Sequence, residues 1–426
     1  MDIRALRARE DVNLLFILID TLRADRLGAY GYERDTSPRI DALAGDGLRF
    51  AEQLAQSSWT KCSMASLWTG LYPARTGVTR SPQGISPEAV LPAEILREAG
   101  YKTAAIWRNG WIAPKFGFHQ GFEVYHSPTV RRVPPSIRRE KPTLGVAGTD
   151  QDTVRSAVEF LRAHGDRRWF LYLHLMDVHQ YVYDEGTALF GTSYSDIYDN
   201  SIRWVDRIVG SLIDEIDARG LRDNTIIVLA SDHGEAFGEH GREGHARDVY
   251  GEVTTTPFIV SLPFRLEKPV VVQTPTANVD LWPTLLDLLK LPSIPETDGL
   301  SRMPELMAAA RGESPPPERG PRFAHIDENW AKLDKPALPM VSVSDGDFRL
   351  LIGASAGGRG RLFDLSRDPG EQHDLAGEQP QTLARMKDLA RKYLASPPAP
   401  WGAAPEVGLG EAELDQLRAL GYSVEN

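Results

Sequence analysis

The sequence predicts an α/β fold: a large, mostly parallel sheet flanked by helices, followed by a small C-terminal α+β subdomain. The first observation is a nearly continuous apolar run over residues 12–19, VNLLFILI, which is typical of a strand buried on both faces of a parallel sheet. The second is that runs of this kind alternate with stretches of helical periodicity. They recur at 102–107, 169–175, 225–230 and 258–262. This alternation favours a doubly wound α/β sheet.

Helices are expected between these strands. The longest covers residues 194–219, where apolar side chains recur at helical spacing, and shorter helices are expected near 38–44, 61–69 and 92–99. The Pro- and Gly-rich segment 311–322 is typical of a linker or exposed loop. Beyond it, strands are expected at 339–344, 348–352 and 362–365, and a helix at 381–394. We therefore predict a larger α/β domain over 1–315 and a C-terminal subdomain with a small antiparallel sheet and a helix over 316–426.

Composition excludes several classes of protein. The 426 residues are 42% apolar and 25% charged, as in ordinary globular proteins, and the net charge is −11 without a long basic run. This argues against nucleic acid or an anionic membrane as the main partner. The single cysteine, Cys62, excludes an intrachain disulfide and a multi-cysteine zinc site. No signal peptide is visible and the first apolar run is far shorter than the ~20 residues of a membrane helix, so we expect no membrane span and, by default, a cytoplasmic location.

Polar side chains follow the ends of three expected strands. Asp20 follows the first strand, Asp177 and His179 follow the strand at 169–175, and Asp232 and His233 follow the strand at 225–230. A single aspartate after a strand is most often a turn residue or a helix cap. Three such places at one sheet edge favour a ligand site, because ligands of open α/β sheets bind at the carboxyl ends of the strands. Asp20, Asp232 and His233 are suitable ligands for a divalent cation.

Further candidates lie in the loops. Thr60 begins the helix expected at 61–69, and from its position alone an ordinary N-cap is the better explanation. A helix N-terminus also attracts oxyanions, however, and a metal-bound hydroxyl there would be an activated nucleophile. His240 and His245 lie in a Gly-rich segment that is suited to form an active-site wall. Arg108 and Asn109 follow the strand at 102–107, where they either donate to substrate oxygens or form a solvated strand end.

The chain resembles the sulfatase branch of the alkaline phosphatase superfamily. The resemblance rests on six blocks in the family's order, which lie at residues 13–50, 57–78, 169–181, 225–245, 279–306 and 362–376. It implies an alkaline-phosphatase-like catalytic domain over 1–315, a divalent metal ion and hydrolysis of a sulfate or phosphate ester. By residue matching, Asp20, Asp232 and His233 fall on metal-ligand positions. His179 falls on the histidine that contacts the ester group or the leaving oxygen.

Other matches implied by the resemblance concern the substrate. His245 falls where relatives place a substrate-facing lysine or histidine. Arg108 falls near the family's active-site lysine, and Asn109 competes for that alignment. With His240, these two residues are the candidate substrate-binding side chains.

The chain departs from the family at the nucleophile. Sulfatases of this type carry C-x-P-x-R, whose cysteine becomes formylglycine and lies nine positions before a Thr-Gly pair. In this chain the pair is Thr69-Gly70, so Thr60 takes the nucleophile position and Cys62 falls on the motif's proline. Cys62 is expected to be a packed core cysteine. Thr21 replaces a second aspartate, and Tyr181 stands where a two-metal relative has the histidine of Asp-x-x-x-His. One metal ion is therefore expected, either Mn, Mg, Ca or Zn.

The leading functional hypothesis is a metal-dependent hydrolase of phosphate monoesters or diesters. In it Thr60 is a metal ligand and the nucleophile, while His179 and His245 stabilise charge or protonate the leaving group. The alternatives are a sulfuric ester hydrolase, a phosphotransferase that uses an alcohol acceptor, and a catalytically silent binding module. The expected substrate is a small-molecule, lipid or glycan ester, with specificity set by residues 127–148 and 181–194.

Overall fold

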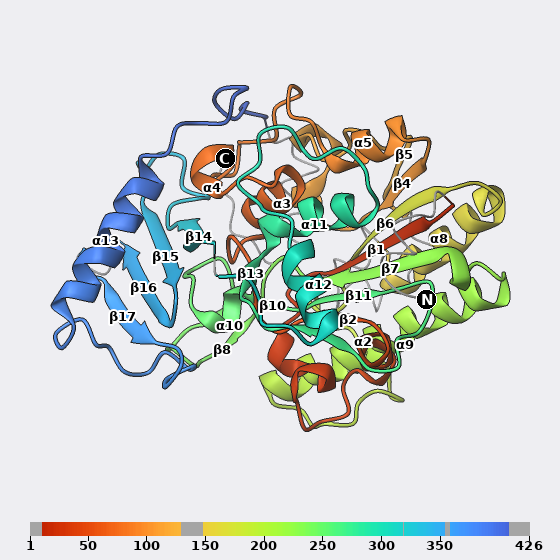
Figure 1. The fold of residues 1–426 in the computed structure, drawn as a ribbon, viewed down its shortest axis with the longest axis horizontal. Helices are drawn as coiled ribbons and strands as arrows, with labels where there is room; N and C mark the ends of the chain where they lie inside the picture. The colour runs from red at the N-terminus through yellow and green to blue at the C-terminus, as the bar shows by residue number, and fades with distance from the viewer. Residues whose placement is uncertain (1–10, 129–147, 318, 354–357, 409–426) are drawn as a thin grey trace.

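The computed structural model describes residues 11–128, 148–317, 319–353 and 358–408. Its main sheet has eight strands in the order β12-β2-β11-β7-β1-β6-β4-β5 (Figure 1). At its centre β1 (Asn13–Ile19) lies between β7 (Thr225–Ala230) and β6 (Trp169–Leu175), and β4 (Lys102–Ile106) follows β6. These four strands are parallel, so their carboxyl ends meet at one edge of the sheet.

The outer strands complete a mostly parallel sheet, as predicted. β5 (Val124–His126) extends the parallel set beyond β4. On the other side β11 (Phe258–Ser261) runs antiparallel to β7, and β2 (Leu48–Phe50) and β12 (Val270–Val272) follow it. Strands of three residues carry too little periodicity to be recognised in the sequence, which is why β2, β5 and β12 were not predicted.

Both faces of the sheet are covered by helices, which explains the continuous apolar runs. Alternate residues of β1 point to opposite sides, with Phe16 in one core and Ile17 in the other. Helices that contribute to the first core are α3 (Thr60–Thr69), α5 (Pro92–Glu98), α11 (Leu281–Leu288) and α12 (Met303–Arg311). Those that contribute to the second are α2 (Pro38–Gly45), α8 (Asp150–His164) and α9 (Tyr194–Ala218).

Helix α3 begins one residue earlier than expected. Its N-cap is Trp59, and Thr60 is the first helical residue, so the interpretation of Thr60 as an N-cap is wrong. No side-chain hydrogen bond caps this helix end. The threonine hydroxyl is therefore not used in the helix and is available to other groups. The helix ends at Thr69, and its C-cap is Gly70, whose φ of 69° is left-handed.

The C-terminal part forms a second, smaller sheet. Its antiparallel strands are β14 (Arg322–Asp327), β15 (Pro339–Asp345), β16 (Phe348–Gly353) and β17 (Arg361–Asp364), and α13 (Pro380–Leu394) packs against it. Figure 1 shows this unit at one end of the molecule. The predicted small antiparallel sheet and helix are confirmed. Ala324 and Ile326 of β14 belong to the main core, so the two parts share apolar packing, and the boundary at residue 315 stays a prediction.

Several short elements connect these units. They are the strands β3 (Gln53–Leu54), β8 (Ala236–Phe237), β9 (Glu243–Gly244), β10 (Thr255–Thr256) and β13 (Thr276–Ala277), the helices α4 (Pro73–Thr76) and α10 (Gly251–Thr254), and the 3₁₀ turns at Ala24–Arg26, Gly28–Tyr30, Gly110–Ile112, Pro114–Phe116, Arg222–Asn224 and Asn278–Asp280. None of the helices in the described ranges has the length and apolar character needed to span a bilayer.

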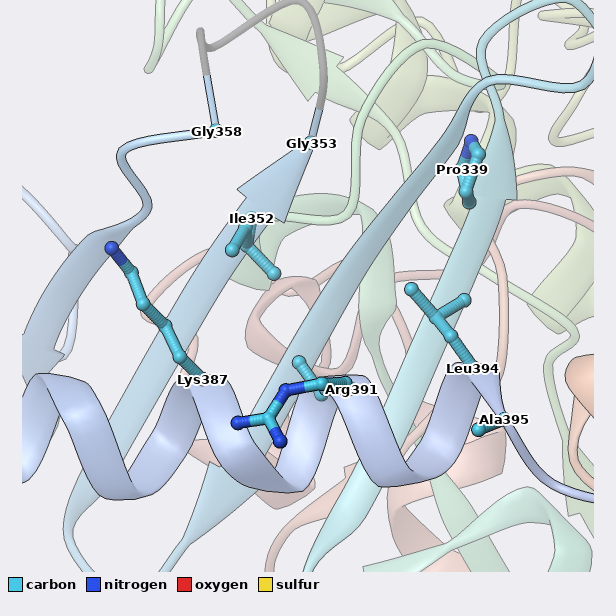
Figure 2. A pocket seen from close by; sticks show the side chains of 9 residues that line it. Pro339, Ile352, Gly353, Gly358, Lys387, Arg391, Leu394 and Ala395 are labelled. Carbon is cyan, nitrogen blue, oxygen red and sulfur yellow. The ribbon is translucent and has the colours of Figure 1, made fainter.

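A pocket of about 550 Å³ opens between α13 and the ends of β15 and β16. Figure 2 shows Lys387 and Arg391 on the helix and Ile352 and Pro339 on the strands around it. Its lining contains none of the residues that the sequence marked as candidates for chemistry.

Candidate active site

The three predicted metal ligands meet at the carboxyl edge of the sheet. Asp20 directly follows β1, and Asp232 and His233 follow the neighbouring strand β7. All three side chains are fully buried, and one ligand atom from each lies within 4.8 Å of the others. His233 Nε2 is 3.4 Å from Asp232 Oδ2 and 3.8 Å from Asp20 Oδ1. We refer to these three residues as the ligand cluster.

Each carboxylate of the ligand cluster accepts hydrogen bonds from the described residues through only one of its two oxygens. Asp20 Oδ2 accepts a hydrogen bond from Asn109 Nδ2 at 2.7 Å and contacts His174 Nε2 at 3.0 Å. Asp232 Oδ1 accepts from the Thr21 amide at 3.3 Å. Asp20 Oδ1 and Asp232 Oδ2 are buried and accept no hydrogen bond from any described residue. Orphaned buried carboxylate oxygens are costly, and a divalent cation is the partner that fits them.

Thr60 completes the set of donor atoms. Its Oγ1 lies 3.2 Å from His233 Nε2 and 3.4 Å from Asn109 Nδ2. His233 Nδ1 lies 2.9 Å from the Gly234 carbonyl oxygen, which only accepts, so Nδ1 carries a proton and the lone pair of the neutral ring is on Nε2. Two carboxylates, one imidazole and one hydroxyl are hard or borderline donors, a set that suits Mg²⁺, Ca²⁺ or Mn²⁺ and is tolerated by Zn²⁺.

The two acids differ in their electrostatics. Burial by itself raises the pKa of Asp20, but the facing His179, His174 and His233 outweigh it and lower that pKa. Burial and the neighbouring Asp20 charge raise the pKa of Asp232. Two carboxylates this close disfavour joint ionisation. A bound cation would remove that conflict.

Two more predicted histidines lie beside the ligand cluster. The His245 ring centroid is 4.7 Å from that of His233 and 4.9 Å from that of His179. Burial lowers the pKa of His179 to about 4, against the pull of the Asp20 charge. Burial by itself lowers the pKa of His245, but the charge of Glu235 and its contact with His245 at 3.2 Å outweigh burial and raise that pKa. His179 is therefore suited to a neutral role and His245 to a proton-donating one.

Backbone strain is concentrated around these side chains. Six non-glycine residues of the described ranges have positive φ, and they include Thr21 (63°), Tyr181 (52°) and Ala246 (60°). Thr21 follows Asp20, and Ala246 follows His245. Strained residues of this kind cluster at functional sites, where the surrounding structure holds them. The sequence did not reveal this, because none of the three is a residue that commonly adopts a left-handed conformation.

Arg108 and Asn109 have different surroundings. Arg108 is fully buried, and its Nη1 donates to one oxygen each of Asp150 and Asp177 at 2.5 Å. Its Nη2 donates to the Gly148 carbonyl and to Gln180 Oε1. Both terminal nitrogens of Arg108 thus donate to acceptors within the protein, which argues against the prediction that Arg108 donates to substrate oxygens. Asn109 contacts Asp20 and Thr60 instead. We refer to Arg108, Asp150 and Asp177 as the arginine cluster.

His240 lies at the junction with the C-terminal sheet. Its Nδ1 is 2.7 Å from Glu252 Oε1, and its ring stacks on Tyr250 with a centroid separation of 3.7 Å. It lines a pocket of about 220 Å³ together with Arg242, Arg361 and residues of β15 and β16. A substrate-binding role for His240 stays a prediction.

Sequence reasoning missed three residues that contact the site. His174 and Tyr172 lie on β6, with Tyr172 Oη 2.7 Å from His174 Nδ1, and Glu235 lies in the loop after β7. The signal for His174 was present, because a histidine in the buried apolar run WFLYLHL requires a partner. Of the expected specificity segment 127–148, residues 129–147 lie outside the described residues.

Comparisons with known proteins identify the family of the chain. The family model "Sulfatase" matches residues 12–291. The chain is 25% identical to N-acetylgalactosamine-6-O-sulfatase of Bacteroides thetaiotaomicron, over 88% of this chain and 92% of that protein. It is 27% identical to arylsulfatase A of Homo sapiens, over 88% of this chain and 86% of that protein.

Solved structures show the same fold. A putative sulfatase from Bacteroides thetaiotaomicron superposes with a TM-score of 0.73 at 20% identity and covers 90% of this chain and 92% of its own. The phosphonate monoester hydrolase of Agrobacterium radiobacter gives a TM-score of 0.71 at 20% identity, over 90% of this chain and 95% of its own. The predicted alkaline-phosphatase-like architecture is confirmed.

Proposed function

Because the chain belongs to the sulfatase family of ester hydrolases, we propose that it hydrolyses sulfate esters with Thr60 as the nucleophile and one divalent metal ion. The observation that carries this proposal is the position of Thr60 Oγ1 at the start of α3, 3.2 Å from Nε2 of His233, the histidine of the ligand cluster. Two carboxylate oxygens of that cluster have no hydrogen-bond partner among the described residues. The sequence placed phosphate esters first. The sulfatase relatives reverse that order, and phosphate esters become the second candidate.

Asp20, Asp232, His233 and Thr60 would hold the metal ion. When bound, a divalent cation lowers the pKa of a coordinated hydroxyl and neutralises charge on the ester oxygens. The open carboxylate oxygens and the hydroxyl favour Mg²⁺ or Ca²⁺, which prefer oxygen ligands, over a soft metal.

The remaining chemistry belongs to the side chains. Thr60 Oγ1, having lost its proton to solvent, attacks sulfur while the bond from sulfur to the leaving alcohol oxygen breaks. His245 donates a proton to that oxygen, and the neutral His179 donates a hydrogen bond to the sulfuryl group. Water then attacks the sulfur of the threonine ester, its bond to Oγ1 breaks, one water proton goes to Oγ1 and the other returns to His245. Sulfate leaves, and Thr60 is restored.

The second candidate, hydrolysis of a phosphate or phosphonate ester, is favoured by the nucleophile itself. A threonine ester cannot collapse through a hemiacetal as formylglycine hydrate does, whereas attack of water on a phosphothreonine needs no such route. An alcohol in place of that water would give transfer instead of hydrolysis.

As substrate class we propose a glycan ester, because the relatives' names include sulfatases of an amino sugar.

A matched substrate panel tests the proposal. The wild-type protein and Thr60→Ala are assayed, with Mg²⁺, Ca²⁺, Mn²⁺ or Zn²⁺, on a sulfate, a phosphate monoester, a phosphodiester and a phosphonate that share one aryl leaving group. We expect the highest kcat/KM on the sulfate and its loss in Thr60→Ala. Preference for a phosphorus ester would promote the second candidate. Stoichiometric metal without turnover of any ester would support the silent binding module.

A further inference from the structure

A buried hydrogen-bonded chain leads away from His245. Both carboxylate oxygens of Glu235 lie 3.2 Å from His245 Nδ1, and Glu235 is 1% exposed. Tyr181 Oη donates to Glu235 Oε2 at 3.0 Å and lies 2.5 Å from Tyr194 Oη. Three separate segments thus converge on one histidine: the loop after β6, the loop after β7 and the start of α9.

The chemistry of these groups sets the orientation of the His245 ring. A carboxylate accepts hydrogen bonds and donates none, so the proton in the contact between His245 and Glu235 lies on Nδ1. Nδ1 and Nε2 lie on opposite sides of an imidazole ring, and the second nitrogen of a functional histidine is set by the bond that the first one makes. Glu235 therefore directs Nε2 away from itself.

Backbone conformation supports the same arrangement. Tyr181 has a φ of 52°, and its Oη reaches Glu235 from that conformation. Ala246, immediately after His245, has a φ of 60° and donates its amide to the Ser58 carbonyl at 2.8 Å, two residues before Thr60. Each such residue costs on the order of 1 kcal/mol or more. One of these two residues, Tyr181, belongs to the hydrogen-bonded chain, and the other, Ala246, directly follows His245.

We propose that Glu235 and Tyr181 are positioning residues that fix the ring and the protonated nitrogen of His245. In this role Glu235 holds Nδ1–H, and Tyr181 holds the Glu235 carboxylate in turn. The contribution of this arrangement to catalysis rests on the proposed function. The orientation of the His245 ring by Glu235 is independent of that function.

Kinetics of variants test the catalytic part. We expect Glu235→Ala to lower kcat by about 10- to 100-fold, Glu235→Gln to lower it less because an acceptor oxygen remains, and Tyr181→Phe to lower it about threefold. KM should change little. Because Glu235 acts through His245, the double variant Glu235→Ala/His245→Gln should be no slower than His245→Gln. Effects that multiply in the double variant would overturn the proposal.

A second measurement does not need activity. Imidazole ¹⁵N spectra of histidine-labelled protein, with His245→Gln for assignment, report which nitrogen carries the proton in the neutral ring. We expect Nδ1–H in the wild type and a shift toward Nε2–H in Glu235→Ala. An Nε2–H ring in the wild type, or identical spectra, would refute the positioning role. If the spectra agree with expectation but no ester is turned over, the proposed function fails and the positioning role stands.

Glu305→Gln is the matched control. Glu305, in α12, is also 1% exposed and is paired with Arg302, the N-cap residue of that helix, so its replacement removes a buried carboxylate outside this chain of contacts. We expect a lower melting temperature with unchanged kcat and unchanged His245 spectra. Circular dichroism of every variant confirms that it is folded.

Discussion

The ligand cluster and the arginine cluster are both fully buried acid pairs at the carboxyl edge of the same sheet, and they differ in how the acids are satisfied. In the arginine cluster all four carboxylate oxygens accept hydrogen bonds from Arg108, from Trp204 or from backbone amides. In the ligand cluster two oxygens are orphaned among the described residues. One pair is neutralised by its own cation, Arg108, and the other is the pair that we propose to bind an external cation.

This difference shows that buried acids alone do not identify a metal site. A metal site is indicated by a buried carboxylate with an oxygen that accepts no hydrogen bond from the protein. The strained residues Thr21 and Ala246 adjoin Asp20 and His245 rather than the arginine cluster. Of the six non-glycine residues with positive φ in the described ranges, half therefore lie at or beside the site that we propose for chemistry.

The largest expected effect is a loss of activity when the nucleophile beside the ligand cluster is removed. Thr60→Ala should lower kcat/KM by at least about 10³-fold, because the substitution removes the hydroxyl that we propose as the nucleophile. Metal binding should persist through the remaining ligands. The control is Thr69→Ala at the other end of α3, whose hydroxyl bonds to the Ala65 carbonyl. Activity of Thr60→Ala within about threefold of wild type would exclude Thr60 as the nucleophile.

The next largest expected effect is a loss of stability when the cation of the arginine cluster is removed. Arg108→Met leaves two buried carboxylates without their cation and should lower the free energy of unfolding by about 3 kcal/mol. Urea denaturation measures this loss. Arg207→Met, at an exposed ion pair with Asp184, should change stability by less than about 0.5 kcal/mol. An equal, small effect of both variants would show that Arg108 does not neutralise the buried acids.

A third experiment sharpens the comparison through metal affinity. Asp20→Asn removes one charged ligand and should weaken binding of Mg²⁺ or Ca²⁺ roughly 100-fold, measured by calorimetry on protein stripped with chelator. Asp177→Asn, in the arginine cluster, should leave that affinity within about threefold. Equal weakening in both variants would contradict the assignment of separate roles to the two clusters.

Much of this architecture followed from the sequence. The runs at 169–175 and 225–230 became β6 and β7 with identical bounds, because strands buried on both faces are continuously apolar. Asp20, Asp232 and His233 were found because parallel strand order brings their ends together.

The rest depended on tertiary contacts. Local spacing does not reveal that Arg108 turns toward Asp150 while its neighbour Asn109 faces Thr60. Nor does it reveal Glu235, because a glutamate in a Gly-rich loop has the pattern of a solvated residue. Such residues are recognised only once burial and hydrogen-bond partners are known.

The smallest expected effect concerns pH. Burial and the adjacent Asp177 raise the pKa of Asp150 to about 7, against the pull of Arg108. The folded protein then holds a proton that the unfolded chain releases near pH 4. Stability from this group is complete at low pH and is lost as pH rises through about 7, a decrease of about 2 kcal/mol between pH 5 and pH 7. Urea denaturation at both pH values should show this decrease in the wild type relative to Asp150→Asn. Parallel pH profiles would mean that Arg108 keeps Asp150 ionised across this range, and the arginine cluster would then be a fully charged counterpart of the ligand cluster.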